Sequence, residues 1–228
     1  MGHGMKLTEV IQGTKKKDYL LLTLQGTDID LRETKLGFAK GRGSVYNIGA
    51  LADNFGVAAD KSDPLKMWMC LGPLEIAGDY TQYDQKDTIG VLSFLFSGVG
   101  SRDERILQTV DRMIADAFLE QFADKRCGEV FMTKDTFTSL FKPTLRTGQL
   151  SVKMAPDAVD VFDVEGNLDK KLRIDAMHLV GQKVNIVVEP KFIFVTKDMA
   201  VVHWRLRQLR FLSPVQISDA DHDSDWSL

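Results

Sequence analysis

Residues 191–211 read KFIFVTKDMAVVHWRLRQLRF, two runs rich in aromatic and β-branched residues joined by a short Thr-Lys-Asp segment. Runs of this kind on either side of a short polar link are typical of a β-hairpin. The sequence therefore predicts paired strands at Lys191–Val195 and Val201–Phe211.

Alternation along the second run divides its side chains between two faces. A strand sends successive side chains to opposite sides, so His203, Arg205 and Arg207 are expected on one face. Trp204 and Leu206 are expected on the other. The hairpin is therefore predicted to have a cationic outer face and an apolar inner face.

Outside the hairpin, the chain is also dominated by predicted strands. These are short runs of Val, Ile, Phe and Leu bounded by Gly, Asp or Pro. They are Tyr19–Leu24, Lys66–Ile76, Thr88–Phe96, Val159–Val164 and Gln182–Val188. No repeat or Pro-rich linker divides the chain, so we expect one mainly β domain over residues 5–217 and a separate tail over 218–228.

One helix interrupts the strands. Ser101 and Glu104 form a capping box, and apolar residues from Ile106 to Phe118 then recur at helical spacing. This pattern predicts a helix over about residues 102–126, and a weaker helix or an irregular segment is expected at Asn47–Phe55.

Charge is distributed unevenly along the 228 residues, whose formal net charge is −3. The tail has no Lys or Arg, and its acids are Asp219, Asp221, Asp223 and Asp225. Residues 170–210 have nine basic and three acidic side chains. A basic region followed by an acidic tail is compatible with an anionic partner despite the negative total. No apolar run is long enough for a membrane-spanning helix, so no membrane association is expected.

The sequence offers weak support for catalysis. Gly98 and Gly100 precede the predicted helix, as in phosphate-binding turns, but Asp103 occupies the place of a third glycine. Two distant cysteines and four histidines give no metal-binding spacing. We expect no enzyme, cofactor or metal, although a small nucleotide-using enzyme stays an alternative.

A cationic strand face with nearby aromatic rings suits single-stranded nucleic acid, because cations contact phosphates and rings stack on bases. The same strands and charges also suit a β-barrel that binds other proteins and no nucleic acid. Oligonucleotide binding at low salt separates these two functions.

The C-terminal half resembles the single-stranded-DNA-binding proteins of large eukaryotic DNA viruses, which are in turn similar to replicative single-strand binders of short-tailed phages. The resemblance covers about residues 130–211. Its motifs are Phe137–Pro143, Val161–Gly166, Leu179–Val188, Phe192–Phe194 and Trp204–Leu209. It implies an OB-fold-like barrel with an inserted helix and a disordered acidic tail.

The resemblance also implies a function and a set of contacts. The protein would coat single-stranded DNA in replication, repair and recombination. His203 is included in the expected site. Phosphates would meet Lys142, Arg146, Lys191, Arg205, Arg207 and Arg210. Bases would stack on some of Trp68, Tyr80, Tyr83, Phe192 and Phe194.

The acidic tail would recruit replication proteins such as a polymerase, helicase or primase, with Trp226 as its apolar anchor. The expected location is intracellular, at the site of viral or host DNA replication. A homodimer stays open.

Overall fold

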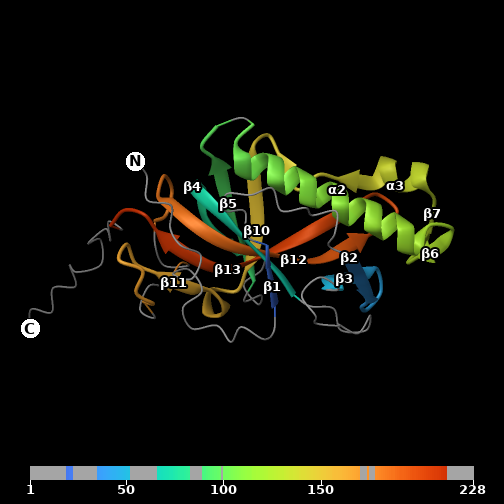
Figure 1. Cartoon of the computed structure of the whole chain (residues 1–228), viewed down its shortest axis with the longest axis horizontal. Helices are drawn as coiled ribbons and strands as arrows, with labels where there is room; N and C mark the ends of the chain where they lie inside the picture. Colours follow the sequence, from blue (N-terminus) through green and yellow to red (C-terminus); the bar gives the residue numbers. More distant parts are fainter. Residues whose placement is uncertain are drawn as a thin grey trace, which may run out of the picture.

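The computed structural model (Figure 1) describes residues 19–22, 35–51, 66–82, 89–98, 100–169, 174 and 178–214. Within these ranges the chain is mainly β, as predicted, with two α-helices, α2 (Arg102–Phe122) and α3 (Lys134–Leu140). The predicted acidic tail and Tyr83 lie outside the described residues.

Five strands close into a mixed barrel. They are β4 (Lys66–Gln82), β5 (Gly90–Phe96), β10 (Gln149–Met154), β12 (Lys183–Val195) and β13 (Ala200–Phe211). Each is hydrogen-bonded to the next in the order β4–β5–β10–β13–β12, and β12 pairs back onto β4. The β10–β13 pair is parallel and the other four are antiparallel. This five-stranded barrel confirms the predicted OB-fold-like architecture.

Strand β12 is continuous across the break predicted between Val188 and Lys191. Its first half pairs with β4, and Phe192–Phe194 pair instead with β3 (Val45–Leu51). The register shifts between Pro190 and Phe192, where the proline has no N–H to donate to a ladder. The bulge therefore coincides with the point where β12 leaves the barrel and joins the hairpin of β3 with β2 (Lys35–Lys40).

The helical pattern at Asn47–Phe55 gave a wrong prediction over its described part, because residues 47–51 belong to β3. Alternation explains the strand: Tyr46 and Ile48 are buried, whereas Val45 and Asn47 on the opposite face are half-buried. The Tyr46 ring packs edge-on against Phe118 of α2, with 5.3 Å between ring centroids. Pairing with β12 and this contact favour the strand over the local helical tendency.

Helix α2 is inserted between β5 and β10 and lies alongside the sheet (Figure 1). Ser101 caps it, its side chain accepting a hydrogen bond from the Glu104 N–H at 3.3 Å. Its buried face contributes Leu107, Val110, Ile114 and Phe118 to the core. The helix ends at Phe122, before the predicted end at residue 126, because Lys125–Cys127 pairs with Val130–Met132 as the β6–β7 hairpin.

Short elements complete the fold. Strand β1 (Tyr19–Leu22) is parallel to β4, and β11 (Asp160–Phe162) is parallel to β13. The remaining elements are β8 (Phe141–Lys142), β9 (Leu145–Arg146) and the 3₁₀ turn Pro156–Ala158. Strand β8 matters for the site because it pairs with the start of β13.

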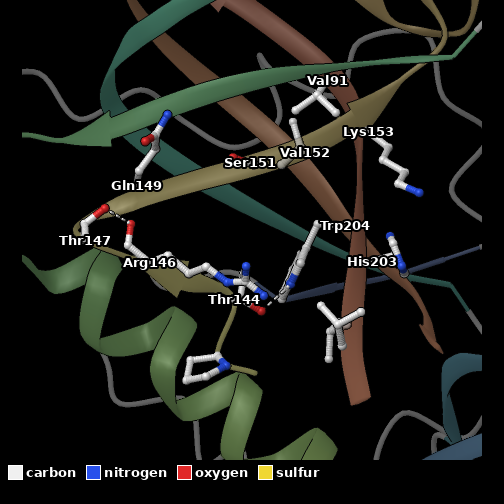
Figure 2. A pocket seen from close by; sticks show the side chains of 13 residues that line it. Val91, Thr144, Arg146, Thr147, Gln149, Ser151, Val152, Lys153, His203 and Trp204 are labelled. Carbon is white, nitrogen blue, oxygen red and sulfur yellow. Dashed lines mark hydrogen bonds between the residues drawn. The ribbon is translucent and has the colours of Figure 1, made fainter. Parts of the chain in front are cut away.

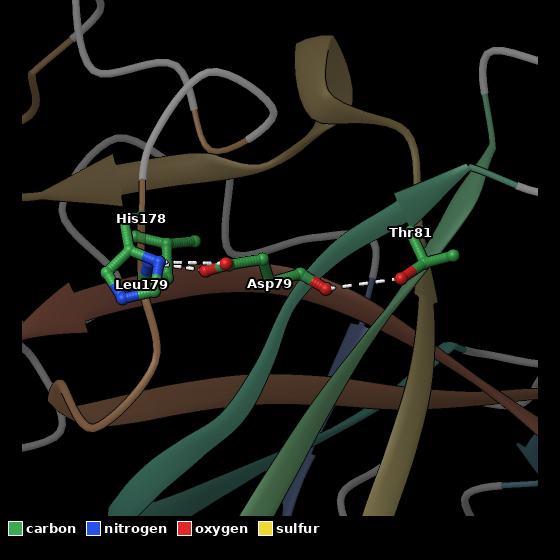
Figure 3. Close-up of polar contacts among 4 residues, drawn as sticks. All are labelled: Asp79, Thr81, His178 and Leu179. Atoms are coloured by element: carbon green, nitrogen blue, oxygen red, sulfur yellow. Dashed lines mark hydrogen bonds and ion pairs between the residues drawn. The ribbon is translucent and has the colours of Figure 1, made fainter. Parts of the chain in front are cut away.

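The connection that enters β12 is fastened to β4 (Figure 3). Asp79 accepts a hydrogen bond from the Leu179 N–H at 2.7 Å, and its other oxygen lies 2.8 Å from His178 Nδ1. The Leu179 N–H is the main cause of the lowered pKa of Asp79. This anchor positions the start of β12 beside β4, where the two strands close the barrel.

Candidate nucleic-acid interface

The alternation predicted for β13 is present in the structure. Trp204 and Leu206 are 2% and 1% exposed and belong to the core, whereas His203, Arg205 and Arg207 are half-buried on the opposite face. The period of two therefore separates the core from a candidate binding surface on this strand.

A row of directly paired residues crosses the outer surface of the barrel. Thr81 on β4 is paired with Val91 on β5, Val91 with Lys153 on β10, and Lys153 with Arg205 on β13. Paired residues point to the same side of a sheet, so Lys153 and Arg205 bring two positive charges together. Arg205 is also paired with Glu189 on its other side, on β12.

Aromatic rings lie beside these cations. The His203 ring is tilted over Phe192 with 4.6 Å between centroids, and its centroid is 6.1 Å from that of Phe194. Burial, and then the charge of Lys153, lower the pKa of His203 to about 4. The imidazole is therefore neutral at pH 7, and the three rings form a largely apolar cluster on β12 and β13, with the Phe194 ring edge-on to His203.

We call this surface the basic–aromatic face. It is defined by Lys142, Lys153, Phe192, Phe194, His203 and Arg205. Lys142 belongs to it because β8 pairs in parallel with β13, which places Lys142 opposite Val201. The face combines the two elements of a single-strand groove, cations for the backbone and rings for the bases.

A pocket of about 380 Å³ opens into this face where β10 and β13 diverge (Figure 2). The two strands share one residue pair, Lys153 with Arg205, and on one side of that pair the seam between them is open. Arg146, Lys153 and His203 provide the charged and titratable lining, and the half-buried Val91 and Val201 provide apolar surface in front of Val152 and Trp204 of the core. Figure 2 shows the Arg146 side chain extending toward Trp204. We call this cavity the seam pocket.

A buried polar chain lies behind the seam pocket. Trp204 Nε1 donates to Thr144 Oγ1 at 2.8 Å, and the Thr144 hydroxyl and N–H both donate to the Asp111 carboxylate on α2. Asp111 is 5% exposed, and burial raises its pKa to about 6. These hydrogen bonds hold the Trp204 indole in place behind the pocket and connect β13 to α2.

Two other predicted cations on β12 and β13 are paired with one buried carboxylate. Arg207 forms an ion pair with Glu189, and Lys191 Nζ lies 3.6 Å from the other oxygen of the same carboxylate. The side chain of Glu189 is 2% exposed. Arg207 and Lys191 therefore neutralise a buried charge, and less of their own charge is available to a ligand than sequence alone suggests.

Three further predicted residues are held by contacts within the fold. Arg210 donates to the Val164 carbonyl at 2.9 Å and packs over the turn at Gly166, whose φ of +88° suits glycine. Trp68 is buried, at 8% exposed, and Tyr80 packs against the core beside Gly90. The structure thus brings Lys142, Arg146, Phe192, Phe194, His203 and Arg205 together.

No family model matches the chain, and no curated protein matches it significantly. The single-stranded DNA-binding protein from bacteriophage Enc34 is 11% identical, with a TM-score of 0.40, and the match covers 82% of this chain and 95% of that chain. For gp2.5, a single-stranded DNA binding protein encoded by bacteriophage T7, the identity is 10%, the TM-score 0.43 and the coverage 68% and 96%.

The Enc34 protein in complex with ssDNA also matches, at 12% identity and a TM-score of 0.38, over 81% of this chain and 97% of that chain. These phage proteins are of the class that the sequence resembles. Similarity this low carries no argument about what this chain binds, so the ligand is inferred below from the chain's own residues.

Strand β10 is the part of the site that sequence reasoning missed. It provides Lys153 to the basic–aromatic face, and Gln149 and Ser151 to the seam pocket. Its sequence, QLSVKM, alternates as a strand does, with Leu150, Val152 and Met154 buried. That alternation is the feature of the sequence from which β10 could have been predicted as a strand.

Two general features of the described residues complete the description of the site. In the part of the chain that the structure describes, no three His, Cys, Asp or Glu side chains gather as a metal site. Nor does any helix there have the length and apolar character to cross a membrane.

Proposed function

We propose that this protein is a non-catalytic single-stranded-DNA-binding protein and that the basic–aromatic face holds the strand. The observation that carries the proposal is the pairing of Lys153 with Arg205 next to the tilted ring pair of Phe192 and His203. The cations attract the phosphates of a strand, and a base on the rings gains stacking energy. Both terms act on any sequence, as a coating protein requires.

The mechanism divides the strand between two kinds of contact. Lys142, Arg146, Lys153 and Arg205 meet phosphates along the seam between β10 and β13. Phe192, Phe194 and His203 provide the stacking surface on the adjoining part of the sheet. Each stacked ring contributes about 1–3 kcal/mol by alanine substitution. In this mechanism the main role of Arg207, Lys191 and Arg210 is to stabilise the fold.

The wider role is proposed from the sequence resemblance. The domain at residues 5–217 coats single strands in replication, repair and recombination, at the site of viral or host DNA replication. The tail at residues 218–228 recruits a polymerase, helicase or primase through its four Asp residues and Trp226. Support for the tail's role is its composition, which has acids and one large aromatic residue but no Lys or Arg.

Binding to labelled oligo-dT over a range of salt concentrations tests the proposed function. We expect Lys153→Ala with Arg205→Ala to weaken binding and to lower the slope of log K against log salt by about 1.4, since each phosphate contact on a single strand contributes about 0.7. The control is Arg112→Ala with Lys134→Ala, two exposed cations on the helices. Parent protein that fails to bind oligo-dT at low salt contradicts the function and favours the protein-interaction alternative.

A further inference from the structure

We propose that Asp111 of α2 is a positioning residue for DNA binding: its carboxylate holds the segment between β8 and β9 so that Lys142 and Arg146 meet phosphates together. The inference rests on the proposed function and adds to it a residue that does not touch the strand. It comes from the sparse pairing of β8 and β9, from the hydrogen bonds that Asp111 accepts, and from the burial of its carboxylate.

Lys142 and Arg146 belong to a segment that the sheet holds at few points. Strand β8 has two residue pairs with β13, and β9 has two with β10. Pro143, which follows β8, is exposed and has no N–H to donate to a ladder. The sheet therefore holds the two ends of this segment, and its middle, at Thr144, depends on other contacts.

Asp111 provides those contacts from the helix. One carboxylate oxygen accepts from the Thr144 N–H at 2.7 Å, and the other accepts from the Thr144 hydroxyl. The same hydroxyl accepts from Trp204 Nε1 at 2.8 Å (Figure 2), so Thr144 is held from both α2 and β13. Thr144 lies two positions after Lys142 and two before Arg146. Fixing this one residue therefore restricts both cations.

A carboxylate suits this arrangement better than any other side chain of its size. Thr144 is half-buried and directs two donors at α2, and an ionised carboxylate accepts at both oxygens. An amide has one acceptor and one donor group, and an apolar side chain has neither. An apolar residue in place of Asp111 would therefore leave both Thr144 donors without an acceptor on the helix.

The burial of Asp111 has a cost that packing alone does not explain. The residue is 5% exposed and lies on the buried face of α2 with Leu107, Val110 and Ile114. Its hydrogen bonds come from Thr144, and burial raises its pKa to about 6, so the ionised form at pH 7 lowers the stability of the fold. Unfavourable groups of this kind are expected where function requires them.

Asp111 acts on a bound strand through Thr144 and not by contact. The described lining of the seam pocket includes Pro143, Thr144 and Arg146 but not Asp111. A negative charge near bound DNA repels phosphates, so removal of this charge should by itself strengthen binding. Weaker binding after substitution of Asp111 therefore reports lost positioning and not lost attraction.

Two neutral substitutions of Asp111 test the inference by titration with labelled oligo-dT. Both remove the charge, but Asp111→Leu removes both acceptors, whereas Asp111→Asn keeps one for the Thr144 N–H. We expect Asp111→Leu to bind about 2- to 150-fold more weakly than parent protein, the range of couplings within one network, and Asp111→Asn to lie closer to parent protein. Equal affinities of the two variants would contradict a role for the hydrogen bonds to Thr144.

A second background separates positioning from a general effect on the fold. In a protein with Lys142→Ala and Arg146→Ala the cations that Asp111 positions are absent, so Asp111→Leu should change binding by less than about 2-fold. The matched control is Gln121→Leu on the same helix. It removes hydrogen bonds of 3.2 and 3.0 Å to the Phe38 N–H and carbonyl on β2, and should leave binding unaltered.

Thermal melts identify the folded variants, and Thr144→Val with Thr144→Ser replaces the Asp111 pair if Asp111→Leu does not fold. Valine lacks the hydroxyl that connects Asp111 to Trp204 and serine keeps it, so weaker binding by Thr144→Val alone is expected. Parental binding by folded Asp111→Leu or Thr144→Val, or an equal loss in both backgrounds, overturns the positioning role and leaves the proposed function standing. Failure of parent protein to bind oligo-dT contradicts the proposed function itself.

Discussion

The two halves of β13 have the same alternating pattern but use their cations differently. In the first half, Arg205 lies opposite Lys153 and beside the His203–Phe192 rings. In the second half, Arg207 is paired with buried Glu189, and Arg210 is bonded to the Val164 carbonyl. One strand thus has positive charge available to a ligand at one end and positive charge bound within the fold at the other.

The buried carboxylates near the two halves of β13 also differ in how they are stabilised. Glu189 lies against Arg207 and Lys191, which compensate its charge. Asp111, behind the first half, receives hydrogen bonds from Thr144 instead, and burial raises its pKa. The neighbouring element therefore decides whether an outward arginine on this strand is available for binding.

The largest expected effect follows from breaking the Glu189 pair. Arg207→Ala leaves a carboxylate that is 2% exposed without its principal cation, so the free energy of unfolding should fall by about 3–5 kcal/mol. Denaturant unfolding measures it. Arg205→Ala, one alternation earlier on the same face, should change the unfolding free energy far less.

A double variant checks the cause of that loss. Arg207→Met with Glu189→Leu removes both charges and keeps apolar volume, so it should recover much of the stability lost in Arg207→Ala. If the single and double variants are equally unstable, packing rather than the uncompensated charge explains the loss.

The next effect concerns pH and the Asp111 carboxylate. Its pKa in the folded protein is raised to about 6 from 3.8, so the folded state binds the proton more tightly than the unfolded state does. This group's contribution to stability should therefore decline as pH rises from about 4 to about 6 and then level off, by roughly 3 kcal/mol in total. Asp111→Asn removes the decline, which shows as a difference between the two unfolding profiles against pH.

Glu189→Gln is unsuitable as a comparison for Asp111→Asn because it also breaks an ion pair. Asp79→Asn is a better one, since Asp79 is exposed and its pKa is lowered. Parallel profiles for the parent and Asp111→Asn proteins would contradict the raised pKa of Asp111.

Local features of the fold could be predicted from sequence because local interactions determine them. The capping box at Ser101 and Glu104 set the start of α2, and alternation identified the inner and outer faces of β13. Features that depend on distant partners could not be read this way. Residues 47–51 became strand through pairing with β12, and α2 ended early because Lys125–Cys127 joined β7.

The candidate site was predictable to the same degree. Phe192, His203 and Arg205 were identified because they alternate on one hairpin. Lys153 was missed because its importance comes from a single pair with β13, 52 positions along the chain from Lys153 to Arg205. Sequence alone also gave Arg207 and Arg205 the same role, since the burial of Glu189 is a property of the folded sheet.

The smallest expected effect separates the two ends of β13 by DNA binding alone. Arg205→Ala should lower the slope of log K against log salt by about 0.7, the value of one phosphate contact on a single strand. Arg210→Ala removes an equal charge from the same strand, but Arg210 packs over the Gly166 turn and donates to Val164, away from the basic–aromatic face. Its salt slope should match that of parent protein in oligo-dT titrations of fully folded samples. Equal reductions in the two variants would mean that DNA follows the whole length of β13, and the division between its halves would then apply to stability and not to binding.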